Sequence, residues 1–396
     1  MKKILAVVLA LALVLSFAAC AGKTTDETTA PSDEETTAAV VESDIMVAMI
    51  TDYGDITDQS FNQTTYEACK AYCEENALGF NYFKPASDSD EDRVAQIENA
   101  IDEGYNVIVM PGYAFANAIK STVGEYEDVK FIALDVGAGD LGDDFEVPAN
   151  LYCAVYQEEL CGYMAGYAAV KLGYTKLGFL GGMAVPAVQR YGYGFVQGVD
   201  AAAAEDAIEG VKVDYCYGNQ FFGDADITAA MDTWYQAGTE VVFACGGGIY
   251  TSAVDAAKKV EGAKVIGVDV DQAGVIANYA AGEGATEEDI AKYADLTVTS
   301  AMKGLAPTVK TLLTSISDGT FEGAIIDTLG LVSAEPADNY VQIAGSTQFG
   351  ENFTEENYKE LVGKLFNNEI TVSNDITKAA ADFATVIEVN DLGNIK

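Results

Sequence analysis

The chain has 396 residues, of which 62 are acidic, 22 are basic and none is histidine, so its formal net charge is −40. Such a charge opposes binding to nucleic acid, which rests on Lys and Arg contacts to phosphates, and it disfavours phosphorylated ligands. The absence of histidine removes the commonest general base, the Ser-His-Asp triad and every histidine-containing metal site. We therefore expect no enzymatic activity, no metal and no cofactor, in a chain long enough for two domains.

The first twenty residues have the pattern of an export signal. Lys2 and Lys3 precede an apolar run over 4–19, which is short for a membrane span and ends in small residues. The segment FAACAG at 17–22 resembles the lipobox of bacterial lipoproteins, whose cysteine is lipidated and becomes the new N-terminus. The resemblance implies a lipid anchor on Cys20, at the extracytoplasmic face of the cell membrane. The alternative is ordinary signal cleavage beside an incidental cysteine.

Residues 21–44 are rich in Thr, Glu, Asp and Ala without apolar periodicity, so we expect a flexible acidic tether. Residues 1–44 hold three basic and seven acidic residues, which leaves −36 of the −40 on the rest of the chain. Six further cysteines include no CxxC pair. This spacing, without histidine, argues against a zinc site and predicts buried free thiols.

From residue 45 onward, short apolar runs alternate with amphipathic stretches. The expected strands are 45–50, 79–86, 106–112, 130–136, 151–156, 176–182, 211–218, 240–248 and 264–271. Helical spacing marks the stretches 61–77, 91–104, 114–126, 190–205, 224–237 and 250–261. Continuous apolar strands alternating with helices predict the α/β class, with parallel sheets covered on both faces. The number of units exceeds one doubly wound sheet, so we expect two α/β lobes.

Ligands of such sheets bind at the carboxyl ends of the strands. The segments that follow the expected strands are rich in glycine, acids and aromatics, and contain no Arg or Lys. This composition suits a neutral polyhydroxyl or heteroaromatic ligand rather than a phosphate. Gly246–Gly248 lacks the Lys and Ser/Thr of a Walker motif, so we do not expect nucleotide binding there. Each segment taken alone is equally well explained as an ordinary strand-to-helix turn.

Several segments must be considered together: DYGDITDQSFNQ at 52–63, VIVMPGY at 107–113, KFIALD at 130–135, GFLGG at 178–182, GFVQG at 194–198, VIGVDVDQ at 265–272, TSAMK at 299–303 and GTF at 319–321. In this order they resemble the basic membrane protein family, the solute-binding lipoproteins of ABC importers, which includes purine nucleoside receptors. The resemblance covers about 45–370.

The resemblance implies a type I periplasmic-binding-protein fold. Its two lobes each hold a doubly wound, mostly parallel sheet, three strands form a hinge, and the ligand lies in the cleft. By analogy, lobe one comprises 45–151 plus 299–325, and lobe two comprises 152–298 plus 326–396. The segment 372–396 matches the family weakly and is not placed.

The resemblance also implies which residues contact the ligand. In nucleoside-binding members two rings sandwich the base. Here these are Phe61 and Phe222, with Phe221 as the competing choice for the second ring. Hydrogen bonds to the base would come from Asn62 and Asp52. An acid and a lysine hold the ribose in the family, and they correspond to Asp269 and Lys303 in this chain.

Lys303 is the expected ion partner of Asp269 and the one basic residue expected in the cleft. Three further positions complete the expected binding set: Tyr113, Asn117 and Gly247. Tyr113 stands where the family usually has Phe, and Asn117 where it usually has an acid. If Asn117 faces the base, the preferred base can differ from the usual purines.

The implied function is a lipid-anchored, extracytoplasmic binding protein that captures a nucleoside, most readily a purine nucleoside, for an ABC permease. One alternative is a receptor for a sugar or another small polar solute. A second is an extracytoplasmic nucleoside or glycoside hydrolase with Asp269 and Asp271 as its acids, although residues i and i+2 of a strand point to opposite sides. A third is a sensory module that feeds a membrane kinase through the same pocket.

Overall fold

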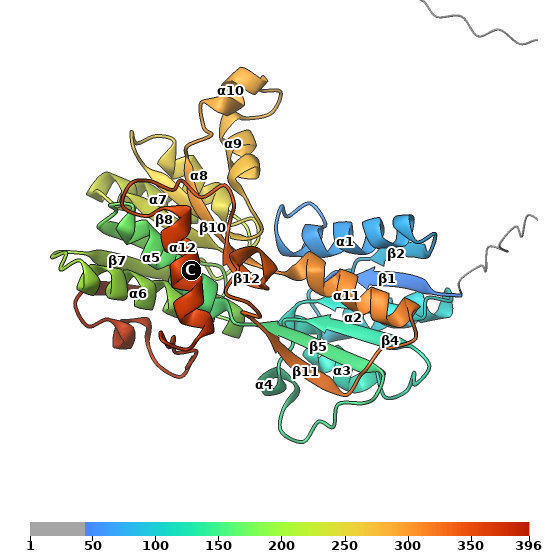
Figure 1. Ribbon diagram of the computed structural model, residues 1–396. Coiled ribbons are helices and arrows are strands. Elements are labelled where there is room, and N and C mark those ends of the chain that lie inside the picture. Colours follow the sequence, from blue (N-terminus) through green and yellow to red (C-terminus); the bar gives the residue numbers. More distant parts are fainter. Residues whose placement is uncertain (1–43, 396) are drawn as a thin grey trace, which may run out of the picture. The chain divides into compact units, whose positions relative to one another are not determined.

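The computed structural model describes residues 44–395, so Cys20, the export signal and most of the expected tether lie outside the described residues. Within this range the fold is built on two sheets, each covered by helices on both faces (Figure 1). Both sheets consist mostly of parallel strands, as the alternating pattern predicts, and the α/β expectation is confirmed. No helix of the described residues is long and apolar enough to cross a membrane.

The first sheet has six parallel strands in the order β11-β5-β4-β3-β1-β2. They are β1 (Met46–Ile50), β2 (Gly79–Phe83), β3 (Val107–Pro111), β4 (Lys130–Leu134), β5 (Leu151–Tyr156) and β11 (Ile325–Leu329). The helices of this part are α1 (Phe61–Glu75), α2 (Asp90–Asp102), η1 (Tyr113–Phe115), α3 (Ala116–Thr122), α4 (Ala138–Leu141) and α11 (Leu305–Ser317).

The second sheet has seven strands in the order β12-β10-β9-β8-β6-β7-β13, and β12 is antiparallel to β10. They are β6 (Lys176–Gly181), β7 (Lys212–Tyr217), β8 (Val241–Cys245), β9 (Lys264–Asp269), β10 (Thr297–Lys303), β12 (Val341–Ile343) and β13 (Glu388–Asn394). Its helices are α5 (Glu158–Lys171), α6 (Pro186–Glu205), α7 (Ala225–Ala237), α8 (Tyr250–Ala257), α9 (Ala273–Ala281), α10 (Glu287–Ala291) and α12 (Glu355–Phe366), with η2 (Pro336–Asp338) and η3 (Ala380–Phe383).

The central strands are buried on both faces. In β1, Val47 and Met49 belong to the core cluster that includes residues of α1 and α11, whereas Ala48 and Ile50 belong to the cluster that includes residues of α2 and α3. Because successive side chains point to opposite faces, a strand covered on both sides must be apolar throughout. This requirement is why the central strands could be recognised as continuous apolar runs.

Helices α5 and α6 pack closely because glycines of each helix face the backbone of the other. A Cβ added to Gly194 would overlap the carbonyl oxygen of Glu159, and one on Gly198 would overlap that of Tyr163. The reverse contacts involve Gly162 and Gly166 of α5. The glycine repeat at 192–198, which does not follow a strand, is therefore a helix-packing surface and not a phosphate-binding loop.

The chain crosses between the two sheets at three places: after β5, after β10, and between β11 and β12. Backbone hydrogen bonds tie these crossings together, from Gln157 N to Leu329 O and from Gly304 N to Tyr340 O. Near each crossing, the residues that belong to each sheet differ from those that the expected lobe limits assign to it. Residues 152–156 and 326–329 lie in the first sheet, and 299–303 lie in the second, because each strand completes its pairing before the chain crosses.

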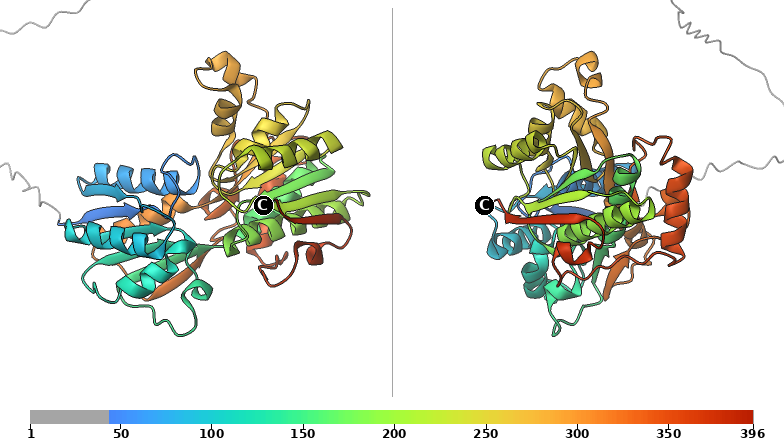
Figure 2. Two further views of the ribbon diagram at one scale, coloured as in Figure 1. Left: turned by 180° about the vertical axis from the view of Figure 1, so that it is seen from behind. Right: turned by 90° about the vertical axis from the view of Figure 1, so that its left-hand side faces the viewer.

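The C-terminal segment, which the family pattern did not place, adds β13 to β7 at an edge of the second sheet (Figure 2). Asp200 of α6 holds the segment in place by accepting hydrogen bonds from the backbone N–H groups of Thr385, Val386 and Ile387. The six cysteines among the described residues are all buried free thiols, as predicted.

Candidate functional site: a cavity at the carboxyl ends of both sheets

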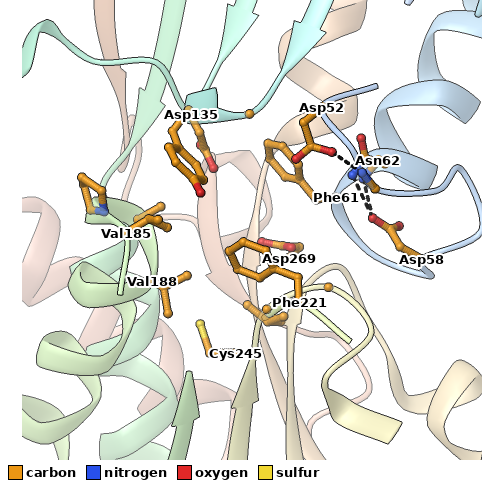
Figure 3. Close-up of a pocket in the computed structure, with 18 of the residues that line it drawn as sticks. Asp52, Asp58, Phe61, Asn62, Asp135, Val185, Val188, Phe221, Cys245 and Asp269 are labelled. Carbon is orange, nitrogen blue, oxygen red and sulfur yellow. Dashed lines mark hydrogen bonds between the residues drawn. The ribbon is translucent and has the colours of Figure 1, made fainter. Parts of the chain in front are cut away.

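A cavity of about 830 Å³ lies at the carboxyl ends of the strands of both sheets (Figure 3). This volume is within the range of small-molecule sites. Its lining includes residues that follow β1, β3 and β4 in the first sheet and β6 and β8 in the second, together with the last two residues of β9. The strand orders explain the position. The direction of winding reverses between β1 and β3 in the first sheet and between β6 and β8 in the second, and a crevice opens at each reversal.

Eight of the nine residues expected to contact a ligand line this cavity: Asp52, Phe61, Asn62, Tyr113, Phe222, Gly247, Asp269 and Lys303. Asn117 does not line it. Its side chain, in α3, donates a hydrogen bond of 2.8 Å to Asp90 Oδ2 at the start of α2. The expectation that Asn117 faces the ligand is therefore wrong, because its side chain is hydrogen-bonded to Asp90 of α2 and does not line the cavity.

Both candidates for the second aromatic ring line the cavity, but their surroundings differ. The Phe221 ring packs against Gly182 and Gly246, where an added Cβ would clash with it. The Phe222 side chain is 60% exposed. The backbone of this segment is tied to the glycine run, because Gly248 N donates to Phe221 O at 2.8 Å.

The cavity lining includes an amide, that of Asn62, between two carboxylates. Asp58 caps the start of α1 by accepting from the backbone N–H groups of Ser60, Asn62 and Gln63. The Asn62 Nδ2 group donates to Asp58 Oδ2 at 3.2 Å and also to Asp52 (Figure 3). With its N–H groups directed at carboxylates, buried Asn62 keeps Oδ1 as an acceptor without a partner.

Asp52 follows β1 and is held by its own loop. Its Oδ1 accepts from the backbone N–H groups of Tyr53 and Gly54 at 2.6 and 2.7 Å. Burial raises the pKa of Asp52, and those backbone hydrogen bonds oppose the shift. Gly112, at φ 125°, leaves the space that the Asp52 carboxylate occupies.

The cavity lining also includes a buried lysine surrounded by acids. Lys303 Nζ lies 2.5 Å from Asp135 Oδ2, 3.6 Å from Glu158 Oε1 and 3.7 Å from Asp269 Oδ1. Burial lowers the pKa of Lys303, but the surrounding carboxylates, Asp135 first, outweigh it and raise the pKa above its usual value. The ammonium group also lies 4.7 Å from the centre of the Phe61 ring.

The acid closest to Lys303 is thus Asp135, and the expected pairing with Asp269 is the longer contact. Asp269 is instead hydrogen-bonded by Ser60 Oγ at 2.6 Å and by Tyr191 OH at 3.4 Å. Burial raises the pKa of Asp269, and Lys303 opposes the shift. Because Ser60 and Asp135 belong to the first sheet's part and Asp269 and Lys303 to the second, these contacts join the two sides of the cavity.

Lys303 is not the one basic residue of the cavity, because Lys84 and Arg190 also line it. Lys84 pairs with the exposed Asp55 at 2.8 Å, and Arg190 Nε pairs with the buried Glu158 at 2.7 Å. Sequence patterns gave no signal for Arg190 or Glu158, which lie on helices outside the matched segments. Asp271 does not line the cavity; it accepts a hydrogen bond from Ser346.

Residues 45–376 match the family model Bmp, described as "ABC transporter substrate-binding protein PnrA-like". The chain belongs to the Bmp family. It is 28% identical over 343 residues to the "ABC transporter nucleoside-binding protein BmpA" of Lactococcus lactis subsp. cremoris, covering 83% of this chain and 89% of that protein. It is also 28% identical over 341 residues to "Basic membrane protein B" of Borreliella afzelii, covering 83% and 88%.

Solved structures support the fold of this Bmp family member. The ABC transporter solute-binding protein of Aeropyrum pernix K1 superposes with a TM-score of 0.61 at 20% identity, covering 86% of this chain and 90% of that one. A solute-binding protein from Conexibacter woesei gives the same TM-score of 0.61 at 20% identity, covering 83% and 99%. The expected periplasmic-binding-protein fold is therefore confirmed, and the protein is an ABC transporter substrate-binding protein of the Bmp family.

Proposed function

We propose that the cavity binds a nucleoside, and that the protein delivers it to the permease of an ABC importer. One observation carries the proposal: a single cavity brings the Phe61 ring and the Asn62 amide together with Lys303, which lies among carboxylates and 4.7 Å from the centre of that ring. A base that stacks on an aromatic ring gains about 1–3 kcal/mol. Ionised carboxylates accept two or more hydrogen bonds, which suits the hydroxyls of a ribose. The printed name of the Lactococcus relative supports the same ligand class.

The proposal extends to a purine as the preferred base. The aromatic pair would be Phe61 with Phe221 or Phe222, and Asn62 with Asp52 would bind the polar edge of the base. Because Asn117 lies outside the cavity lining, its departure from the family pattern gives no reason to expect a different base.

A calorimetric titration of the purified chain without residues 1–20 tests the ligand class. The panel contains purine and pyrimidine nucleosides, the free bases, ribose, glucose and galactose, and each mixture is afterwards analysed for released base. We expect nucleosides to bind. At a ligand concentration of 100 Kd, binding should add about 2.7 kcal/mol to the free energy of unfolding and so raise the melting temperature. If sugars bind and no nucleoside does, the proposal is overturned. Release of free base would instead support the alternative function, a nucleoside hydrolase.

We also propose that acyl chains on Cys20 hold the protein at the extracytoplasmic face of the membrane. Metabolic labelling with palmitate tests this in cells that express the full chain. The wild type is expected to incorporate the label and to sediment with membranes, whereas Cys20→Ala loses both properties. Equal labelling of both proteins would contradict the anchor. Cys69→Ala is the matched control, because Cys69 is fully buried.

A further inference from the structure

Asp135 lines the cavity but is not among the residues expected from the sequence to contact the ligand. It follows β4, and its backbone N–H donates to Ala154 O of β5 at 2.8 Å. Its φ of 59° is in the left-handed region, which Asp and Asn tolerate better than most residues. Left-handed conformations of non-glycine residues cluster at functional sites, where the surrounding structure holds them in place.

The two oxygens of Asp135 are in different situations. Oδ2 accepts the 2.5 Å hydrogen bond from Lys303 Nζ, whereas Oδ1 is buried and has no hydrogen-bond partner in the protein. A buried carboxylate oxygen without a donor is unfavourable, and native proteins leave few such atoms. Since Asp135 lines the cavity, a ligand in the cavity can supply the missing donor.

The neighbouring protein hydroxyls are committed elsewhere. Tyr156 OH donates to Thr308 at 3.0 Å, and both Ser60 Oγ and Tyr191 OH donate to Asp269. Each hydroxyl has one hydrogen to donate. None of these three groups can therefore serve Asp135 Oδ1 without leaving its present acceptor.

We propose that Asp135 Oδ1 accepts a hydrogen bond from a hydroxyl of the ligand's sugar. The sugar is then held by one carboxylate from each side of the cavity, Asp135 and Asp269 (Figure 3). Lys303 contacts both carboxylates. Asp135 thereby makes the site specific for a ligand that carries a free hydroxyl at that position. This inference rests on the proposed binding of a nucleoside.

The test measures dissociation constants for a nucleoside that the wild type binds and for its 2′-, 3′- and 5′-deoxy analogues. In the wild type we expect at least one missing hydroxyl to weaken binding about 10- to 100-fold, as for hydrogen bonds to charged groups. In Asp135→Asn, one of these losses should shrink to within about threefold. Asn is chosen because it also tolerates the left-handed backbone.

Glu158→Gln is the matched control, because Glu158 also contacts Lys303 but does not line the cavity. It should keep the wild-type pattern of losses. An unchanged pattern in Asp135→Asn, or the same shrinkage in both variants, would overturn the inference and leave nucleoside binding intact. If the wild type binds no nucleoside, the proposed function fails, and the inference with it.

A measurement on the wild type alone covers the case in which Asp135→Asn does not fold. Fluorine in place of a hydroxyl can accept but cannot donate a hydrogen bond. If a carboxylate accepts a hydrogen bond from the hydroxyl, the fluoro analogue should lose as much affinity as the deoxy analogue. Full affinity of all three fluoro analogues would overturn the inference.

Discussion

Lys303 is the positive partner that three carboxylates share. It is 6% exposed and lies within 4 Å of Asp135, Glu158 and Asp269. Replacing Lys303 by Met leaves Asp135 and Asp269 without a positive partner, whereas Glu158 keeps its ion pair with Arg190. We therefore expect a loss of about 3–5 kcal/mol in the free energy of unfolding at pH 7. Burial raises the pKa of Glu158 and of Asp269. The loss should therefore shrink at pH 5, closer to these raised pKa values, because protonation of Glu158 and Asp269 reduces the repulsion among the acids.

Urea denaturation of Lys303→Met at the two pH values measures this effect. Lys259→Met is the control, because Lys259 forms an exposed pair with Asp232 and should cost less than about 1 kcal/mol. Equal losses for the two variants, or a loss that does not depend on pH, would show that Lys303 does not compensate the acids.

Glu159 gives a second prediction at the residue scale. Burial, reinforced by the charge of Glu158, raises the pKa of Glu159 to about 7, from 4.5 in the unfolded chain. The folded state therefore holds this proton more tightly, and the group's contribution to stability falls as the pH rises from about 4.5 to 7. The corresponding loss is about 3 kcal/mol.

Glu159→Gln cannot titrate and should lack this decline. The difference in unfolding free energy between Glu159→Gln and the wild type is expected to move by about 3 kcal/mol in favour of the variant across that pH interval. Any constant cost of the amide cancels in this comparison. A pH-independent difference between the two proteins would mean that Glu159 has an ordinary pKa.

At the scale of elements, the contact between α5 and α6 depends on glycine. Gly198→Ala places a Cβ against the carbonyl oxygen of Tyr163, and overpacking of this kind costs about 1–3 kcal/mol, more than the helix propensity gained. Gly363→Ala in α12 is the matched control, since its Cβ meets nothing within 4 Å. It should stabilise by up to about 1 kcal/mol. Thermal unfolding of both variants checks the opposite signs, and a gain for both would contradict the close packing.

The elements that the sequence predicted well are those whose pattern follows from burial alone. Central strands such as β3 and β8 are apolar throughout because helices cover both their faces. In β13 nearly every residue is exposed, and its place beside β7 depends on tertiary pairing and on Asp200, so its own residues carry no strand pattern. Edge elements are therefore the part of the fold that local patterns do not determine.

The same distinction separates the predicted from the unpredicted part of the site. Asp52, Phe61 and Asn62 lie in one contiguous motif at a strand end, so local spacing was enough to bring them to the cavity. The ion pair of Lys303 with Asp135 spans 168 residues and requires the two sheets to face each other. Motif spacing contains no information on that arrangement.

For the molecule as a whole, the two sheets repeat one plan. The order β2-β1-β3-β4-β5 in the first corresponds to β7-β6-β8-β9-β10 in the second. Asp135 follows β4 and Asp269 ends β9, so the two acids occupy equivalent positions, and both have a left-handed backbone, with φ of 59° and 64°. The repeat explains why two acids that are distant in sequence converge on one lysine.

The net charge gives a last prediction at this scale. The chain from residue 45 carries −36, so like charges dominate its surface, and self-repulsion destabilises the compact state. Added salt screens this repulsion, but it also weakens exposed ion pairs such as Lys84–Asp55 and Lys359–Glu335. Because exposed pairs contribute only about 0–1 kcal/mol each, we expect the repulsion to dominate.

The unfolding free energy should therefore rise when NaCl is increased from about 10 mM to 150 mM, an interval in which the Debye length falls from about 30 to 8 Å. Urea denaturation at pH 7 measures the change, with sucrose at equal osmolality as the uncharged control. Replacing several exposed acids by Gln, away from ion pairs and from the cavity, should raise the stability at low salt and flatten the salt dependence. A stability that falls with salt would show that ion pairs outweigh the repulsion among the acids.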